Sequence, residues 1–74
     1  QINGFTDSTG SFQTNQSLSE QRASSVGRYF MNQGVAASRI RTTGLGPRDP
    51  IADNSTASGR EQNRRVEIEM LPTQ

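Results

Sequence analysis

Apolar residues are sparse along this chain, and they follow two different periods. Between residues 18 and 30 they fall on one arc of a helical wheel, whereas near the C-terminus they alternate with charged residues. The first pattern is typical of an amphipathic helix packed on one side, and the second of a half-buried strand. The helical arc consists of Leu18, Ala23, Val26, Tyr29 and Phe30; the inward positions of the strand are Val66, Ile68 and Met70.

Local signals predict the boundaries of the N-terminal elements. Residues 1–6 are compatible with a strand, and Asp7–Gln16 is polar, as expected of a surface loop. Ser17 is the expected N-cap of the helix, with Glu20 reaching back to complete a capping box, and Gly34 is the expected stop.

The C-terminal half predicts two further strands and a short helix. Ser38–Leu45 resembles a strand, Gly46–Ala57 a long loop rich in turn residues, and the capping box Ser58–Glu61 the start of a short helix. Arg65–Met70 is the last strand, which Pro72 should end.

The predicted order is strand, helix, strand, short helix, strand, which is an α+β class, a two-layer sandwich with a small mixed sheet. The two strands joined through the long helix should run parallel in a right-handed crossover, and the last strand should be antiparallel to them. With 74 residues, of which 28% are hydrophobic, the chain is long enough for one small core.

Composition excludes several kinds of chemistry. The chain has no His, Cys or Lys, so Cys/His zinc sites, thiol nucleophiles, Ser-His triads and Schiff-base lysines are all ruled out. We therefore expect no metal, no cofactor and no classical catalysis. An acid–base pair of Asp7 with Glu20, Glu61 or Glu67 is the remaining enzymatic alternative, and no pattern brings these residues together.

Charge and hydropathy restrict the partners. Eight arginines against seven acidic residues give a net charge of +1, and the chain has one Tyr and three Phe, which argues against a nucleic-acid binder. No apolar run approaches the ~20 residues that span a bilayer, so direct membrane insertion by this segment is not expected. The start at Gln1, without an initiator Met, suggests a fragment of a longer protein.

Four blocks of sequence carry a resemblance to a known family. The first two have the form G-F-T-D-S-T-G and N-Q-S-L-S-E-Q-R-A-S-S-V, and the blocks at 34–46 and 54–68 follow in order. Together they resemble OmpA-like domains, whose usual form is G-H-T-D-x-x-G followed by N-x-x-L-S-x-x-R-A-x-x-V. Phe5 replaces the usual His. Ser38–Arg41 and Gly44–Pro47 look closest to the lipoprotein-type relatives, those similar to the peptidoglycan-associated lipoprotein.

The resemblance implies a single peptidoglycan-binding domain over residues 1–74 that lacks the family's N-terminal strand and helix. An exposed sheet edge would then favour a homodimer or a swapped dimer. The implied function is noncovalent binding of the diaminopimelate residue of the stem peptide, which tethers the outer membrane or an envelope complex to the cell wall. The implied location is the periplasm of a Gram-negative bacterium, at the outer membrane or cell wall. The alternative is the wall anchor of a flagellar motor-stator-type protein.

By the same resemblance, Asp7 and Arg22 bind the ligand. A carboxylate and a guanidinium together match the ammonium and carboxylate at the side-chain end of diaminopimelate. The residues alone leave other interpretations open: Asp7 suits an Asx-turn or a helix-type cap. Arg22 suits a side chain whose stem packs on the apolar arc while its head reaches solvent or pairs with Glu20 or Glu61.

Three further residues join the site by resemblance. Thr9 and Asn15 are expected to be hydrogen-bond partners of the stem peptide. Arg65 is expected near the ligand and preferred over Arg64, although both arginines could also be solvated charges beside the sheet. Asn63 is expected to fix the backbone.

Overall fold

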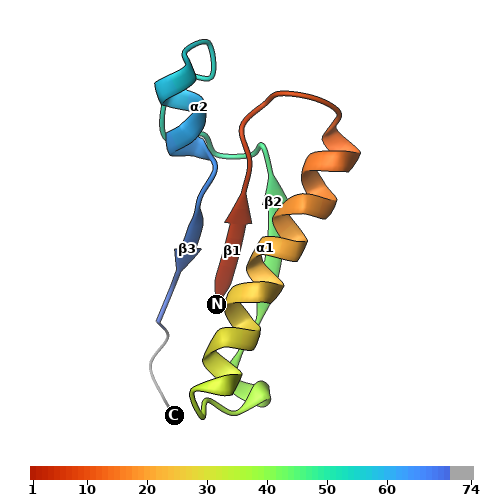
Figure 1. Ribbon diagram of the computed structural model, residues 1–74, viewed down its shortest axis with the longest axis vertical. Coiled ribbons are helices and arrows are strands. Elements are labelled where there is room, and N and C mark those ends of the chain that lie inside the picture. Colours follow the sequence, from red (N-terminus) through yellow and green to blue (C-terminus); the bar gives the residue numbers. More distant parts are fainter. Residues whose placement is uncertain (71–74) are drawn as a thin grey trace.

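The computed structural model describes residues 1–70 and has two layers, a sheet and one long helix lying across it (Figure 1). The elements are β1 (Ile2–Phe5), α1 (Phe12–Asn32), a 3₁₀ turn η1 (Ala37–Arg39), β2 (Thr42–Gly46), α2 (Ala57–Asn63) and β3 (Val66–Ile68). The predicted α+β class and the predicted order of strands and helices are confirmed.

The sheet is mixed, with strand order β2-β1-β3. β1 pairs with β2 in parallel and with β3 antiparallel, as the sequence predicted. α1 packs over β1 and β2 and does not cover β3, while α2 lies beyond the end of the sheet (Figure 1). The carboxyl ends of β1 and β2 therefore meet at one edge of the sheet, near the start of α1.

The helix α1 begins earlier than the sequence suggested. Its N-cap is Ser11, whose Oγ accepts a hydrogen bond from the Thr14 backbone N–H at 3.1 Å, so the predicted cap at Ser17 is wrong and Ser17 lies inside the helix. The first turn has no buried apolar residue to mark it. The segment from Phe12 onward therefore looked like loop in the sequence.

Small residues form the contact between α1 and the sheet. The buried positions of the helix are Asn15, Ser19, Ala23 and Gly27, whereas Tyr29, from the predicted arc, is 54% exposed. The helix is thus rotated away from its large apolar residues, because Gly4 and Gly44 pair in register and let it approach closely. A Cβ on Gly4 would lie 2.1 Å from the Ser19 carbonyl oxygen.

Two predicted boundaries in the C-terminal half were also wrong. The residues Ser38 and Arg39 belong to the 3₁₀ turn, and β2 begins only at Thr42. Thr56, not Ser58, caps α2: its Oγ1 accepts a hydrogen bond from the Gly59 N–H at 2.9 Å. The cap lies two residues earlier because Thr56 has the extended backbone that an N-cap requires.

The strand β3 is shorter and more exposed than predicted. Ile68 pairs in register with Ile2, yet Ile2 is 3% exposed and Ile68 is 53% exposed. Met70 is 91% exposed. The prediction that Ile68 and Met70 are buried is therefore wrong, because α1 leaves the face of β3 uncovered. Pro72, the predicted end of the strand, lies outside the described residues.

Candidate functional site

The candidate site lies at the carboxyl edge of β1, where three segments converge. The loop after β1 leads into α1, and the turn from α2 into β3 lies beside it (Figure 1). Asp7 and Thr9 come from the loop, Asn15 and Arg22 from α1, and Arg64 from the turn. The fold thus brings together residues that are up to 57 positions apart.

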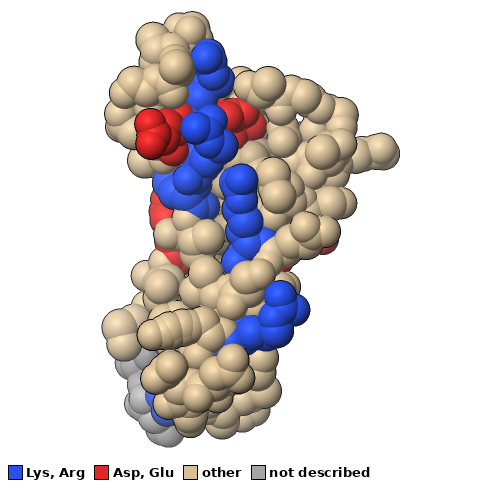
Figure 2. Space-filling view, viewed as in Figure 1, with Lys and Arg blue, Asp and Glu red and all other residues tan. Residues whose placement is uncertain are grey.

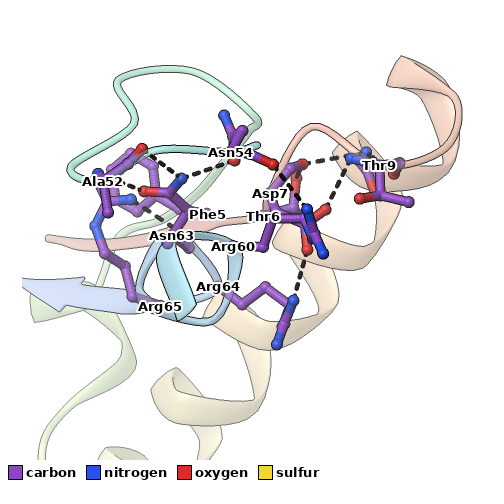
Figure 3. A network of polar contacts seen from close by, with 12 residues as sticks. Phe5, Thr6, Asp7, Thr9, Ala52, Asn54, Arg60, Asn63, Arg64 and Arg65 are labelled. Carbon is purple, nitrogen blue, oxygen red and sulfur yellow. Dashed lines mark hydrogen bonds and ion pairs between the residues drawn. The ribbon is translucent and has the colours of Figure 1, made fainter. Parts of the chain in front are cut away.

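Asp7 is the carboxylate of this edge, and both of its oxygens are engaged. Oδ1 accepts the Thr9 backbone N–H at 2.8 Å in an Asx-turn, and Oδ2 contacts Arg64 Nη1 at 2.7 Å (Figure 3). The residue is only 7% exposed. The hydrogen bond from Thr9 and then the Arg64 guanidinium hold the pKa of Asp7 below its usual value, so the carboxylate stays charged.

Asn15 fixes the loop that carries Asp7. Its Nδ2 donates to the Thr9 carbonyl at 2.8 Å and to the Asp7 carbonyl at 3.4 Å. Both amide protons are thereby used, and Oδ1 keeps its acceptor capacity. The predicted residues Thr9 and Asn15 therefore lie beside Asp7, and they order its backbone.

Arg22 projects from α1 toward the end of β1. Its Nη1 reaches the Phe5 carbonyl at 3.5 Å, the outer limit of a hydrogen bond. Asp7 follows Phe5 by two residues, so the Arg22 guanidinium lies within roughly 10 Å of the Asp7 backbone. Within residues 1–70 Arg22 forms no ion pair, and the pairs considered with Glu20 and Glu61 are not present. Its charge is available to a ligand.

The two adjacent arginines have different roles. Arg64 contacts Asp7, and its side chain is 42% exposed. Arg65 instead stacks on the Phe5 ring, 3.8 Å from guanidinium carbon to ring centroid, and donates to the Asp49 carbonyl at 2.9 Å and the Asn63 carbonyl at 3.3 Å. Its Nε also pairs with Glu67. The sequence favoured Arg65 for this site; the structure places Arg64 there.

Asn63 connects α2 to the preceding loop, as expected of a residue that fixes backbone. Its fully buried side chain accepts the N–H groups of Ile51 and Ala52 at 2.8 and 3.0 Å. It also donates to the Ala52 carbonyl at 3.0 Å and to Asn54 Oδ1 at 2.7 Å (Figure 3). This network holds the end of α2 in place, immediately before Arg64.

Positive charge gathers along this side of the molecule. Figure 2 shows the arginine side chains in a column that runs from α2 down toward α1, with acidic side chains beside its upper part. No three His, Cys, Asp or Glu residues of the described part come together as a metal site. Within residues 1–70, neither helix has the length and apolar character to cross a bilayer.

The lowered pKa of Asp7 predicts how acid affects stability. A carboxyl whose pKa is lower in the folded state contributes stability above its unfolded pKa, about 3.8 for Asp7, and that stability is lost as the pH falls through the folded pKa. We expect Asp7→Asn, which keeps an acceptor for Thr9 but loses the Arg64 ion pair, to reduce this acid-dependent loss. Urea unfolding of the parent and of Asp7→Asn at a series of acidic pH values measures this loss of stability.

Glu61→Gln is the matched control, because Glu61 has no ion pair within the described residues. It should keep the acid dependence of the parent. An Asp7→Asn protein that loses stability with acid as steeply as the parent would contradict the prediction.

The sequence of this chain is similar to those of several known proteins. Residues 1–64 match the model of the OmpA family. The chain is 62% identical over 69 residues to the probable lipoprotein YiaD of Escherichia coli, covering 93% of this chain and 32% of the relative. It is 55% identical over 67 residues to the peptidoglycan-binding protein ArfA of Mycobacterium tuberculosis, covering 90% and 21%.

A solved structure shows the same fold. The C-terminal domain of Helicobacter pylori MotB superposes with a TM-score of 0.82 at 33% identity, covering 89% of this chain and 51% of that one. The chain therefore spans about half of this structure and about a third or less of the two curated relatives.

Proposed function

This chain belongs to the OmpA family, and on that basis we propose that it binds peptidoglycan noncovalently, through the diaminopimelate residue of the stem peptide. The observation that carries the proposal is the charged pair at the end of β1: a buried Asp7 carboxylate, and an Arg22 guanidinium that lies within roughly 10 Å of the Asp7 backbone and has no ion pair in the described residues. A relative of 55% identity is named for peptidoglycan binding, which supports the same ligand.

The recognition chemistry follows from the two ends of the ligand. The ammonium of diaminopimelate binds the Asp7 carboxylate, whose oxygens each keep a further acceptor position beside Thr9 and Arg64. The neighbouring carboxylate of the ligand binds Arg22, a planar donor that suits two-point contacts. Arg64 lies at the same carboxylate and is exposed enough to join it.

The other residues act around this pair. Thr9 and Asn15 are proposed to hydrogen-bond the stem peptide through the exposed Thr9 side chain and the Asn15 Oδ1. Arg65, whose guanidinium is engaged by Phe5 and by two backbone carbonyls, is proposed to support the site by holding the end of β1. No step of this recognition transfers a proton, so the proposed activity is binding and not catalysis.

In the cell, we place the chain in the periplasm, as a tether between the cell wall and the outer membrane or an envelope complex. Relatives named as lipoproteins and outer-membrane proteins support this role. A second candidate role is the wall anchor of a flagellar motor-stator-type protein. The fold shared with the C-terminal domain of Helicobacter pylori MotB favours that alternative.

The test is an NMR titration of the chain with a stem peptide that contains diaminopimelate. Saturable shifts should centre on Asp7 and Arg22. Arg22→Ala should weaken binding roughly tenfold to a hundredfold, because a hydrogen bond to a charged group contributes about 1.5–3 kcal/mol. Arg41→Ala, which removes an exposed arginine before β2, is the control and should bind as the parent does.

A lysine-type stem peptide, which lacks the distal carboxylate, makes the test specific. The parent should prefer the diaminopimelate peptide, whereas Arg22→Ala should bind both peptides equally weakly. If the folded parent binds both peptides alike, the assignment of the ligand carboxylate to Arg22 is wrong. If it binds neither, the proposed function itself fails for this chain.

A further inference from the structure

A further arginine, Arg48, lies at the carboxyl edge of the sheet, on the β2 side of Asp7. It follows β2 by two residues, in a turn where its N–H donates to the Leu45 carbonyl at 3.2 Å. The residue is exposed, and within residues 1–70 it forms no ion pair, not even with the adjacent Asp49. The positive charge of Arg48 therefore has no acidic partner among the described residues and is available to a ligand at this edge.

The Arg48 side chain is nevertheless held in place. Its Nη1 donates to Gln16 Oε1 and to the Leu45 carbonyl, both at 3.2 Å, and its guanidinium carbon lies 5.1 Å from the Phe12 ring centroid. Gln16 is fixed in turn, because its Nε2 donates to the Gly44 carbonyl. The hydrogen bonds and the cation–π contact offset the entropy that an exposed arginine loses when it is ordered. Both hydrogen bonds use Nη1, so Nε and Nη2 keep their donors for a ligand.

Phe12 gives this arginine an apolar neighbour. It is the first residue of α1, and it is 51% exposed although Arg48 lies over its ring. An exposed aromatic residue alone needs no explanation. Beside an ordered guanidinium it completes a surface for a small amphiphilic group, because a methyl group can contact the ring while a carboxylate contacts the guanidinium.

The first turns of α1 connect this surface to the Asp7 site. Asn15 holds the loop that carries Asp7, and the next residue, Gln16, holds Arg48. The segments that follow β1 and β2 leave the sheet at the same end, where α1 begins (Figure 1). A ligand that binds Asp7 can therefore extend along the start of α1 toward Arg48.

We propose that Arg48 and Phe12 bind the residue that follows diaminopimelate in the stem peptide, an alanine that carries the terminal carboxylate. The inference rests on the proposed function, because it extends the ligand assigned there to Asp7 and Arg22. Arg48 binds the terminal carboxylate through Nε and Nη2, and the alanine methyl group contacts the Phe12 ring. The chain thereby prefers a stem peptide whose terminal carboxylate is free over one whose carboxylate is consumed in an amide cross-link.

The length of the ligand fits this arrangement. The carbon that bears the diaminopimelate ammonium and the alanine carboxylate carbon are about eight bonds apart, roughly 10 Å when extended. The Thr6 N–H donates to the Gly46 carbonyl at 2.8 Å, which places the Asp7 and Arg48 Cα atoms within roughly 16 Å of each other. The ligand, an arginine side chain of roughly 7 Å and a hydrogen bond at each end together span more than that distance. One stem peptide can therefore contact both groups.

The test is an NMR titration with two stem peptides that differ only at the C-terminus, one with the free alanine carboxylate and one with a carboxamide. The parent should bind the carboxylate peptide about tenfold more tightly, because only that peptide forms a charge-assisted contact with Arg48. The Arg48 Nε–H resonance should shift with this peptide alone. Arg48→Gln keeps a donor for Gln16 Oε1 but loses the charge, so it should bind both peptides as the parent binds the carboxamide. Arg41→Gln makes the same charge change at an exposed arginine and should keep the parent's preference.

Phe12→Ala tests the apolar half of the surface. It should weaken binding of both peptides about threefold, because each contains the alanine methyl group that contacts the ring. Equal affinity of the parent for the two peptides, or an Arg48→Gln variant that keeps the preference, overturns the inference and leaves the proposed function standing. Binding of neither peptide by the folded parent overturns both.

Discussion

Asn63→Ala is expected to lower the free energy of unfolding by about 3 kcal/mol or more, because each buried polar group left without a partner costs about 1–3 kcal/mol. The substitution removes the acceptor of the Ile51 and Ala52 N–H groups and the donor to the Ala52 carbonyl. A domain of this size has little stability to lose. Urea unfolding followed by circular dichroism should therefore find that the variant is largely unfolded or only marginally stable.

Two companion variants separate the hydrogen bonds from the simple loss of volume. Asn54→Ala removes one of the two acceptors of Asn63 Nδ2 and leaves the Ala52 carbonyl, so it should cost about 1 kcal/mol or less. Asn63→Asp keeps the oxygen that accepts both N–H groups. Its second oxygen replaces the Asn63 amide nitrogen and faces two acceptors, the Ala52 carbonyl and Asn54 Oδ1. An Asn63→Ala protein as stable as Asn54→Ala would show that the network contributes little.

The pH dependence of Asn63→Asp sharpens the test. The introduced carboxyl faces acceptors, so its pKa should rise in the folded state. A group with a raised folded pKa contributes stability at low pH and loses it as the pH rises through that value. The stability deficit of Asn63→Asp relative to the parent should therefore narrow on acidification, because the protonated carboxyl regains a donor. A deficit that is constant with pH would contradict this account.

The sequence predicted the order of elements because each element has a local signal, and the crossover rule then gave the directions of the strands. Alternation identified β3, and the apolar period between Leu18 and Phe30 identified α1. The start of α1 had no such signal. Ser11 caps a first turn that is polar and solvent-exposed, while Ser17 and Glu20 matched a capping box inside the helix. Either serine fits the local rule, and only the folded backbone distinguishes them.

The buried face of α1 depends on what lies opposite it. Hydrophobic period alone favoured a face with Leu18 and Tyr29, and both are exposed. The glycine pair of Gly4 and Gly44 removes side chains from the sheet directly under Ser19, so the closest packing uses small residues. A sequence shows where glycines are but not which of them become neighbours, so this contact could not be predicted.

The relative placement of the candidate site residues was predictable as far as the family pattern reached. Asp7, Thr9 and Asn15 lie together, and Arg22 projects toward the same end of β1. The sequence favoured Arg65 over Arg64, whereas Asp7 contacts Arg64, because alternation gives the face of a strand and not the contacts beyond its end. In the structure, Arg65 stacks on the Phe5 ring, and Arg64 is the arginine that contacts Asp7. Phe5 in place of the usual His was the available signal.

Gly4→Ala is expected to be the most damaging single methyl addition at the contact between helix and sheet. The new Cβ would lie 2.1 Å from the Ser19 carbonyl oxygen, a distance that no contact tolerates. Gly4 is paired with Gly44 on one side and with Val66 on the other, so β1 cannot shift without breaking these pairings. The α1 helix must therefore move away from the sheet. Overpacking usually costs 1–3 kcal/mol, and a clash between two fixed backbones should cost about 3 kcal/mol or more.

Gly27→Ala is the matched control for that variant, because it adds the same methyl group to the same contact. Its Cβ would meet Thr42 Cγ2 at 3.0 Å and Ile40 Cγ2 at 3.3 Å, which are side-chain atoms that can shift. Alanine also favours the helix over glycine by about 1 kcal/mol, which offsets the crowding. Denaturant unfolding should find Gly27→Ala near the parent and Gly4→Ala far below it. Equal losses in the two variants would mean that the close approach of Gly4 to Ser19 does not set the position of α1.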